Sequence, residues 1–337
     1  IRDMKKIFIA VLAVAALASC SKEQTIMVDD QKVAIGFDTF VENSTRANDL
    51  TKGNFDFGVY GLVEKGGENA LIFNNQEVAA DGSYSPAQYW IAAAQYYFTA
   101  IAPYTNAKWA YYTDTAHTGT IAFDNQAAAA NQDLLFAYVK PAQTPDEIKA
   151  TPDKVGFTFN HMLSRVRFTF ANGFGAGSNI TLQVTDVTIT DAYATAQLAV
   201  ENGTPAAAWK NFGTTFSKNF GHVGGATPAT LTDEGVTTEG ATVSAATEHF
   251  YLIPADKAYE VTFYVTLYQA GVKLDTYART ATIPATEMEK GMSYDIKTTL
   301  TANNTSDDGE LYPIVFEVKG VTEWDQFGDG DITGALN

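Results

Sequence analysis

The sequence contains a single cysteine, Cys20, among its 337 residues. One thiol cannot form an intrachain disulfide, and no other cysteine is present for nucleophilic chemistry or metal binding. The four histidines are scattered without H-x-x-x-H spacing, and neither a G-x-S-x-G turn nor a phosphate-binding glycine loop occurs. The sequence therefore predicts no catalytic residues, no metal site and no cofactor, and we do not expect an enzyme.

Positive charge is also scarce. Lysine and arginine together number 22 against 39 acidic residues, which gives a formal net charge of −17. This balance excludes a nucleic-acid partner, because phosphate binding requires clusters of cationic side chains. Hydrophobic residues make up 46% of the chain and charged residues 18%, which is typical of a folded protein long enough to form two domains.

One long apolar run occurs, from Ile7 to Ala18, directly after Met4 and two lysines. This run is too short to span a bilayer and has the charge and length of a signal peptide over residues 1–19. Residues 1–3 are expected to precede the true start. The run ends in Leu-Ala-Ser-Cys, which resembles the lipobox of bacterial lipoproteins. The pattern predicts lipidation of Cys20.

Beyond residue 30 the main pattern is alternation of apolar and polar residues between turn-forming Gly, Pro, Asn and Asp. It predicts an all-β protein of two β-sandwich domains, over residues 47–175 and 176–337, which meet at the Gly-rich stretch 171–179. The apolar residues change parity near Ser164, which predicts a bulge or bend there. His161 alternates with Phe157 and Phe159, so we interpret it as a packed, hydrogen-bonded side chain.

Two other features allow a second interpretation. The aromatic residues between 89 and 112 are typical of a sandwich core, although such side chains also stack on sugars. The acidic segments 303–310 and 325–334 are typical of turns or chain ends, although carboxylates also bind calcium.

Arg46 differs from the other arginines of the body. Arg165, Arg167 and Arg279 fall in strand-like segments, whereas Arg46 lies in a polar stretch of turn-forming residues. A protease binds its substrate as an extended, accessible segment. The sequence therefore predicts cleavage between Arg46 and Ala47 by an arginine-specific protease, with removal of residues 20–46 as a propeptide.

The segment before Arg46 has the pattern of a strand with one apolar face, formed by Val33, Ile35, Phe37 and Val41. Its removal would expose an apolar groove with unpaired backbone groups, which favours capture of another strand. A suitable donor lies within about 311–337, where the apolar residues are Ile314, Phe316, Val318, Val321 and Trp324. The pattern alone equally allows the last strand of its own domain.

The chain resembles the fimbrillin family of Bacteroidetes type V pilins. The matching features are the lipobox, the single accessible Arg46 after a first strand, the segment "FNHMLSRVRFTF" and the terminal "PIVFEVKGVTEW". The resemblance implies two transthyretin-like β-sandwich domains in tandem. It also implies a lipoprotein precursor that is transported to the outer membrane, and cleavage after Arg46. It further implies assembly with other pilin subunits into a surface fimbrium by donor-strand exchange.

The presence of both Arg46 and an apolar C-terminal strand favours a stalk subunit over a tip or anchor subunit. The alternative from another class is an uncleaved surface lipoprotein that binds a glycan or a host protein. Adhesion by either kind of protein would involve a ligand on a host or bacterial surface, and the sequence does not identify this ligand.

Overall fold

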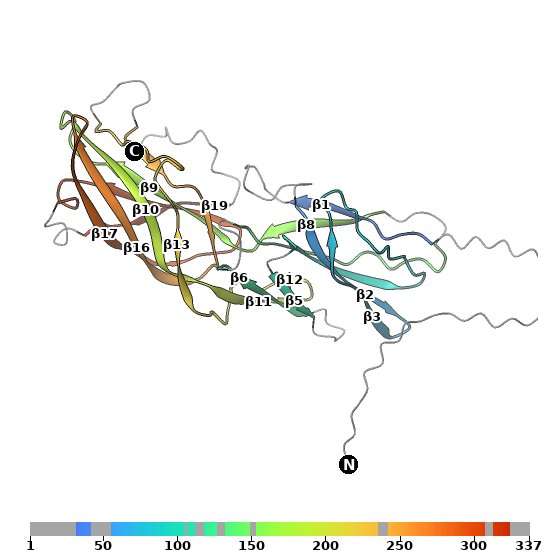
Figure 1. Ribbon diagram of the computed structural model, residues 1–337. Helices are drawn as coiled ribbons and strands as arrows, with labels where there is room; N and C mark the ends of the chain where they lie inside the picture. The colour runs from blue at the N-terminus through green and yellow to red at the C-terminus, as the bar shows by residue number, and fades with distance from the viewer. Residues whose placement is uncertain are drawn as a thin grey trace, which may run out of the picture. The chain divides into compact units, whose positions relative to one another are not determined.

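The computed structural model describes residues 32–41, 55–104, 107–111, 118–126, 132–148, 153–234, 242–306 and 313–323. Every regular element in these ranges is a β-strand (Figure 1), which confirms the all-β prediction. Among these residues no helix has the length and apolar character needed to cross a membrane.

The N-terminal part is built on a six-stranded sheet in the order β1-β8-β7-β4-β2-β3. β1 is an edge strand and runs parallel to β8 (Figure 1). The sheet consists of β1 (Phe37–Val41), β2 (Phe57–Lys65), β3 (Glu68–Val78), β4 (Gln95–Ala102), β7 (Leu135–Val139) and β8 (Val155–His161).

A four-stranded sheet packs with the six-stranded sheet. Its order is β12-β11-β6-β5, and its strands are β5 (Ala107–Tyr111), β6 (Gly119–Asp124), β11 (Thr195–Glu201) and β12 (Thr204–Pro205). Tyr60 and Ile101 of the larger sheet share one buried cluster with Ile121, Phe123 and Leu198 of the smaller one. The inward side chains of the two sheets therefore form a common core, as in a β-sandwich.

Two further sheets form the C-terminal part. One has the order β13-β10-β16-β17, and the other β14-β9-β18-β19 with β15 beside β9. Their strands are β9 (Ser164–Asn172), β10 (Ile180–Tyr193), β13 (Thr215–Asn219), β14 (Ser244–Ala246), β15 (Phe250–Leu252), β16 (Asp256–Gln269), β17 (Val272–Glu287), β18 (Met292–Leu300) and β19 (Glu317–Glu323).

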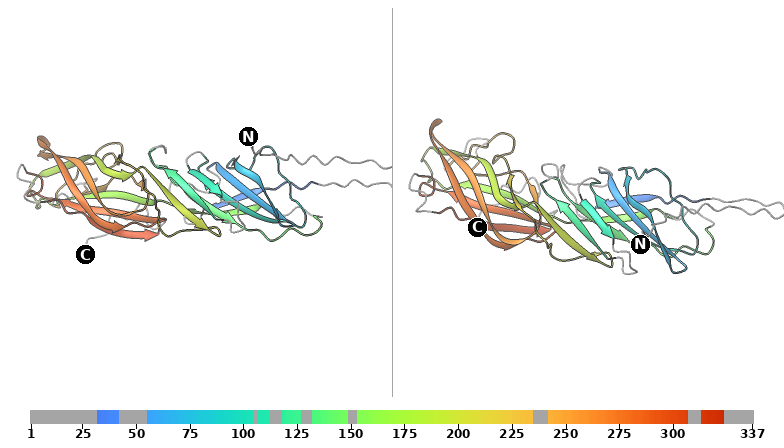
Figure 2. Two further views of the ribbon diagram at one scale, coloured as in Figure 1. Left: turned by 90° about the horizontal axis from the view of Figure 1, so that it is seen from below. Right: turned by 60° about the horizontal axis from the view of Figure 1, so that its bottom comes forward.

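Alternation explains how these two sheets pack. Val261, Phe263 and Val265 of β16 are buried and share one cluster with Phe168 and Phe170 of β9. β16 and β17 pair antiparallel over most of their length and lie side by side in each view (Figure 2). The period of two therefore identifies the buried face of this sandwich correctly.

The strand pairs do not follow the predicted division at residues 171–179. β9 pairs with β18 of the C-terminal part, and β11 pairs with β6 of the N-terminal part. The Gly-rich stretch is a turn between β9 and β10, in which Gly177 has a φ of +80°. The change of sheet occurs between β8 and β9, and this change accounts for the shift of parity near Ser164.

Lys218 of β13 is a buried cation. Its side chain lies beside the rings of Phe216 and Phe250, with Nζ 5.9 Å from each ring centroid. Only 6% of the residue is exposed, and this burial lowers the pKa of Lys218 to about 8. The ammonium form is therefore less favoured in the folded chain than in water.

We expect Lys218→Met to raise the free energy of unfolding at pH 7 by about 1 to 3 kcal/mol. An unfolded lysine titrates near pH 10.4, so between pH 8 and pH 10 the unfolded state binds more protons and the wild type gains stability with rising pH. The advantage of the variant should shrink across that window. Urea unfolding at pH 7 and pH 10 tests this, with Lys210→Met at an exposed site as the control. An equal gain at both pH values would contradict the account.

Candidate functional site

The leading segment, residues 33–41, lies at the edge of the six-stranded sheet. β1 pairs with β8 in parallel register from Phe37 opposite Val155 to Val41 opposite Phe159. Just before the strand, the N–H of Val155 donates to the carbonyl of Gly36 at 2.8 Å. One side of residues 36–41 is thus bonded to β8.

The opposite side of its first residues is bonded to the stretch 84–90. The N–H of Ile35 donates to the Gln88 carbonyl at 2.9 Å, and the N–H of Trp90 donates to the Val33 carbonyl at 3.0 Å. The Tyr84 hydroxyl donates to the Ile35 carbonyl at 2.7 Å. Burial raises the pKa of Tyr84, so this donor stays protonated at physiological pH. Together, β8 and residues 84–90 form the two walls of what we call the seat of the leading segment.

Aromatic rings line the seat. Ile35 and Phe37 are each 1% exposed. The ring of Phe37 contacts four others, with centroid distances of 5.4 Å to Phe73, 5.4 Å to Tyr84, 5.9 Å to Phe98 and 5.7 Å to Phe157. Burial of such a side chain is worth roughly 1.5 to 3 kcal/mol, and each ring pair adds about 0.5 to 1.5 kcal/mol.

Gly82 brings a further part of the chain against the leading segment. It has a φ of +84°, and a Cβ at this position would lie 2.7 Å from the carbonyl oxygen of Phe37. Only glycine combines this conformation with this close approach. Of the other predicted residues of the segment, Val33 is half-buried, and the side chain of Val41 lies outside the described part.

Cys20, Arg46 and Ala47 lie outside the described residues, whereas the three other arginines of the body are described. Arg165 is 1% exposed, and its Nε donates to Ser293 Oγ at 2.9 Å. Arg279 donates from Nε to the Asn304 carbonyl and from Nη2 to the Ser306 carbonyl, at 3.0 and 2.6 Å.

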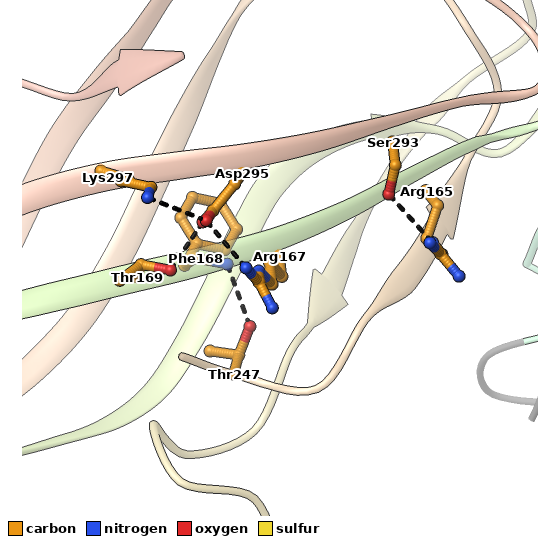
Figure 3. A network of polar contacts seen from close by, with 8 residues as sticks. All are labelled: Arg165, Arg167, Phe168, Thr169, Thr247, Ser293, Asp295 and Lys297. Carbon is orange, nitrogen blue, oxygen red and sulfur yellow. Dashed lines mark hydrogen bonds and ion pairs between the residues drawn. The ribbon is translucent and has the colours of Figure 1, made fainter. Parts of the chain in front are cut away.

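Arg167 belongs to a polar network between β9 and β18 (Figure 3). Its Nη2 lies 3.0 Å from Oδ2 of Asp295, a carboxylate that is 1% exposed. Thr169 donates its hydroxyl to the other carboxylate oxygen at 2.6 Å, and Lys297 Nζ lies 3.3 Å from Oδ2. Arg165, Arg167 and Arg279 are therefore held in strands by side-chain contacts, as the sequence interpretation required.

The C-terminal segment, residues 313–323, packs in the core of its own sandwich. Ile314 is 6% and Phe316 is 1% exposed. Phe316 contacts the rings of Phe168, Phe170 and Phe263 at centroid distances of 5.6, 5.9 and 6.2 Å. In this chain the segment is thus the last strand of its own domain, which is the alternative that the pattern left open.

β19 holds the rest of this segment at a sheet edge. It pairs antiparallel with β18, with Val318 opposite Ile296, and the Thr298 hydroxyl donates to the Val315 carbonyl at 2.8 Å. Val318 is partly buried against the core. Val321 lies in β19 with its side chain outside the description, and Trp324 lies beyond the described residues.

The remaining candidates from the sequence are His161, the aromatic stretch and the two acidic segments. They either lie in the core or stay untested. His161 is buried, with Nδ1 2.7 Å from Asp133 Oδ2, so the interpretation as a packed, hydrogen-bonded residue is confirmed. Tyr96 and Phe98 are core residues. Within the described ranges, no three His, Cys, Asp or Glu residues gather as a metal site would require. Most of the two acidic segments lies outside those ranges.

The sequence interpretation missed the second wall of the seat. Tyr84, Gln88 and Trp90 lie in a stretch without strand periodicity, so the pattern gave no reason to place them beside the leading segment. The only signal was the pair of turn-forming residues Asp81 and Gly82, which predicts a reversal of the chain. Contacts across such a turn depend on the tertiary fold.

The comparisons with known proteins agree with an all-β protein. A family model described as fimbrillin-like matches residues 45–311. The chain therefore belongs to the fimbrillin-like family, a family of structural proteins and not of enzymes. Among curated proteins none matches the chain.

Two solved structures are similar to this chain, and the first of them shares its fold. A fimbrial protein from Bacteroides vulgatus is 16% identical over 87% of this chain and 99% of its own, with a TM-score of 0.61. A candidate cell adhesion protein from Bacteroides ovatus is 14% identical over 87% of this chain and 98% of its own, with a TM-score of 0.46.

Proposed function

We propose that this protein is a fimbrial stalk subunit that is exported as a lipoprotein and polymerises by donor-strand exchange at the cell surface. One observation carries the proposal. The leading segment is an edge strand that plugs an aromatic-lined seat, and residues 42–54, which include Arg46, connect it to the rest of the body. A cut after Arg46 would therefore free the plug from the body.

Departure of the leading segment would leave the seat with unpaired backbone groups and exposed apolar side chains. The backbone groups of Val155, Gln88 and Trp90 that bond to it would lose their partners. The rings around Phe37 would lose the side chain that fills the space between them. An open sheet edge beside an apolar groove favours capture of another strand. The proposed donor is the C-terminal segment of a second subunit.

The C-terminal segment must leave its own core to act as a donor. Its position favours this, because β19 is at the edge of its sheet and the chain continues beyond it for residues 324–337. The proposed partners are therefore other pilin subunits, an arginine-specific protease, and the outer membrane through lipid on Cys20 of the precursor. Adhesion to a host or bacterial surface would be the role of the assembled fimbrium.

A full-length Cys20→Ser chain, which carries no lipid, tests the proposal directly. Incubation with an arginine-specific protease is expected to release the part of the chain that ends at Arg46 and to convert monomers into linear polymers visible by electron microscopy. The uncut chain in the same buffer is the control and should stay monomeric. Complete cleavage without polymers would contradict donor-strand exchange.

The same digestion tests how well the body is protected. Because Arg165, Arg167 and Arg279 are held in strands, we expect one cut in the body, after Arg46, even when the protease is in excess. Intact mass spectrometry measures this. As a control, the chain unfolded in urea should be cut after all four arginines of the body, Arg46 included. Early cleavage at Arg279 or in β9 of the native chain would show that these strands open easily. It would contradict the selective accessibility of Arg46 to the protease.

The packing of Ile314 and Phe316 in their own core specifically favours a second candidate function. A subunit complete in itself could act as an uncleaved surface lipoprotein that binds a glycan or a host protein, or as a tip or anchor subunit. Surface material that begins at acylated Cys20 would favour this candidate.

A further inference from the structure

The leading segment and the C-terminal segment share a short pattern. Ile35-Gly36-Phe37-Asp38 in the first corresponds to Ile314-Val315-Phe316-Glu317 in the second. In both, the isoleucine and the phenylalanine are buried and the residue between them is not. Both phenylalanines lie among aromatic rings, Phe37 among four and Phe316 among three. The two segments thus bury the same two types of side chain, at the same spacing, in aromatic surroundings.

We propose that Ile314 and Phe316 of one subunit occupy, in the next subunit, the positions that Ile35 and Phe37 vacate. The donated segment runs in the same direction as β1, parallel to β8, with Pro313 at the position of Ala34 and Val318 at the position of Thr39. This register rests on the proposed function, since it requires the leading segment to leave.

The backbone bonds of the seat accept this register, including its proline. The wall of residues 84–90 bonds to Ile35 and to the carbonyl of Val33, and β8 bonds to the carbonyl of Gly36. None of these bonds uses the N–H of Ala34. Proline lacks that donor, so Pro313 fits at this position without loss of any of them.

The side chains also fit. The three atoms nearest to a Cβ at Gly36 all belong to the side chain of Lys154, and the first of them is Cγ at 3.1 Å. Lys154 is exposed and flexible, so it can move aside for Val315. Thr39 is 5% exposed, and Val318 would place a side chain of the same shape there without a hydroxyl to satisfy. A shift by two residues would instead put Val318 in the space of Phe37 and leave it underfilled.

Exchange in this register improves the surroundings of the donated segment. In its own subunit the stretch 313–316 precedes β19, and Val315 is 66% exposed. In the seat the corresponding stretch 34–37 is bonded on both sides, and Gly36 is only half-exposed. Residues 313–316 therefore gain backbone hydrogen bonds in the seat, in exchange for the bond from the Thr298 hydroxyl to Val315 and the pairing of β19 with β18, and the valine loses contact with water.

Disulfides between introduced cysteines can test the register. Cys20 is the only native cysteine, so in its absence every disulfide must form between the introduced residues. Ala34 lies opposite Tyr89 in an antiparallel bridge, and opposed residues of this kind have Cβ atoms close enough for a disulfide. In a Cys20→Ser background, chains carrying Tyr89→Cys with Leu311→Cys, Pro313→Cys or Val315→Cys are cut after Arg46, assembled and oxidised. Ala34→Cys with Tyr89→Cys in the uncut chain is the positive control for disulfide geometry.

We expect the pair at 89 and 313 to give a ladder of covalent oligomers on a non-reducing gel, at least tenfold more abundant than with 311 or 315. The uncut chain should give no ladder, because its seat is occupied. Polymers cross-linked through 311 or 315 would overturn the register while leaving donor-strand exchange intact. Polymers cross-linked through none of the three positions would overturn the register and indicate that another segment is donated. Absence of polymers with every variant, and with the parent chain, would instead refute the proposed function and the register with it.

Discussion

Arg46→Ala is expected to abolish fibre formation while leaving a folded subunit. Without the cut, the leading segment stays tethered to the body, so Ile35 and Phe37 remain in the seat and block any donated strand. The expected effect is loss of polymers by at least a hundredfold, measured by electron microscopy and by sedimentation of surface material. The variant should keep the thermal stability of the uncut wild type, because the substitution lies outside the segment that fills the seat.

A rescue variant separates loss of the cut from loss of the arginine side chain. Replacement of residues 43–49 by the recognition sequence of an unrelated protease should give no fibres until that protease is added. Polymers should then form at the rate seen with cut wild-type chains. Normal fibres from Arg46→Ala, or no rescue after complete cleavage of the replacement, would contradict release of the leading segment as the trigger.

Phe37→Ala should destabilise the precursor and leave the mature subunit unchanged. Removing a phenylalanine that is 1% exposed and touches four rings costs about 3 to 5 kcal/mol in a core that cannot collapse around the space. After the cut, residue 37 leaves with the released segment, so mature variant and mature wild type are the same molecule. Urea unfolding of both chains before and after cleavage measures this difference.

The exposed neighbour Ala34 provides a matched control, because Ala34→Ser should change neither form. We also expect the cut Phe37→Ala segment to dissociate faster than the wild-type segment, since each 1.4 kcal/mol of lost binding is worth about tenfold. A stability loss that persists in the mature subunit would mean that the leading segment stays bound after cleavage.

Local alternation explains which parts of the fold were predictable. The period of two located β16 and the buried residues of the leading segment, because one face of each meets a core. β2, β4 and β7 were located as further strand candidates, although β4 is buried on both faces. It did not reveal which sheet each strand joins. Strand pairing depends on contacts far apart in the sequence. The sequence therefore did not predict that β9 pairs with β18 and β11 with β6, although the change of parity near Ser164 was visible.

The candidate site was predictable to the same extent. Ile35 and Phe37 were identified as residues on the apolar face of a strand, but the wall of residues 84–90 has no pattern of its own. The C-terminal segment shows the other limit of the method. An apolar strand fits any seat of the right chemistry, and the sequence cannot state whether Phe316 fills its own core or a neighbour's. Both Phe37 and Phe316 are surrounded by aromatic rings, and these surroundings arise from the tertiary fold.

The N-terminus and intact mass of subunits recovered from the bacterial surface test the central claim most directly. The account predicts a chain that begins at Ala47, carries no lipid and lacks the leading segment. A chain that begins at acylated Cys20 in assembled fibres would contradict it, because the seat would still hold Ile35 and Phe37.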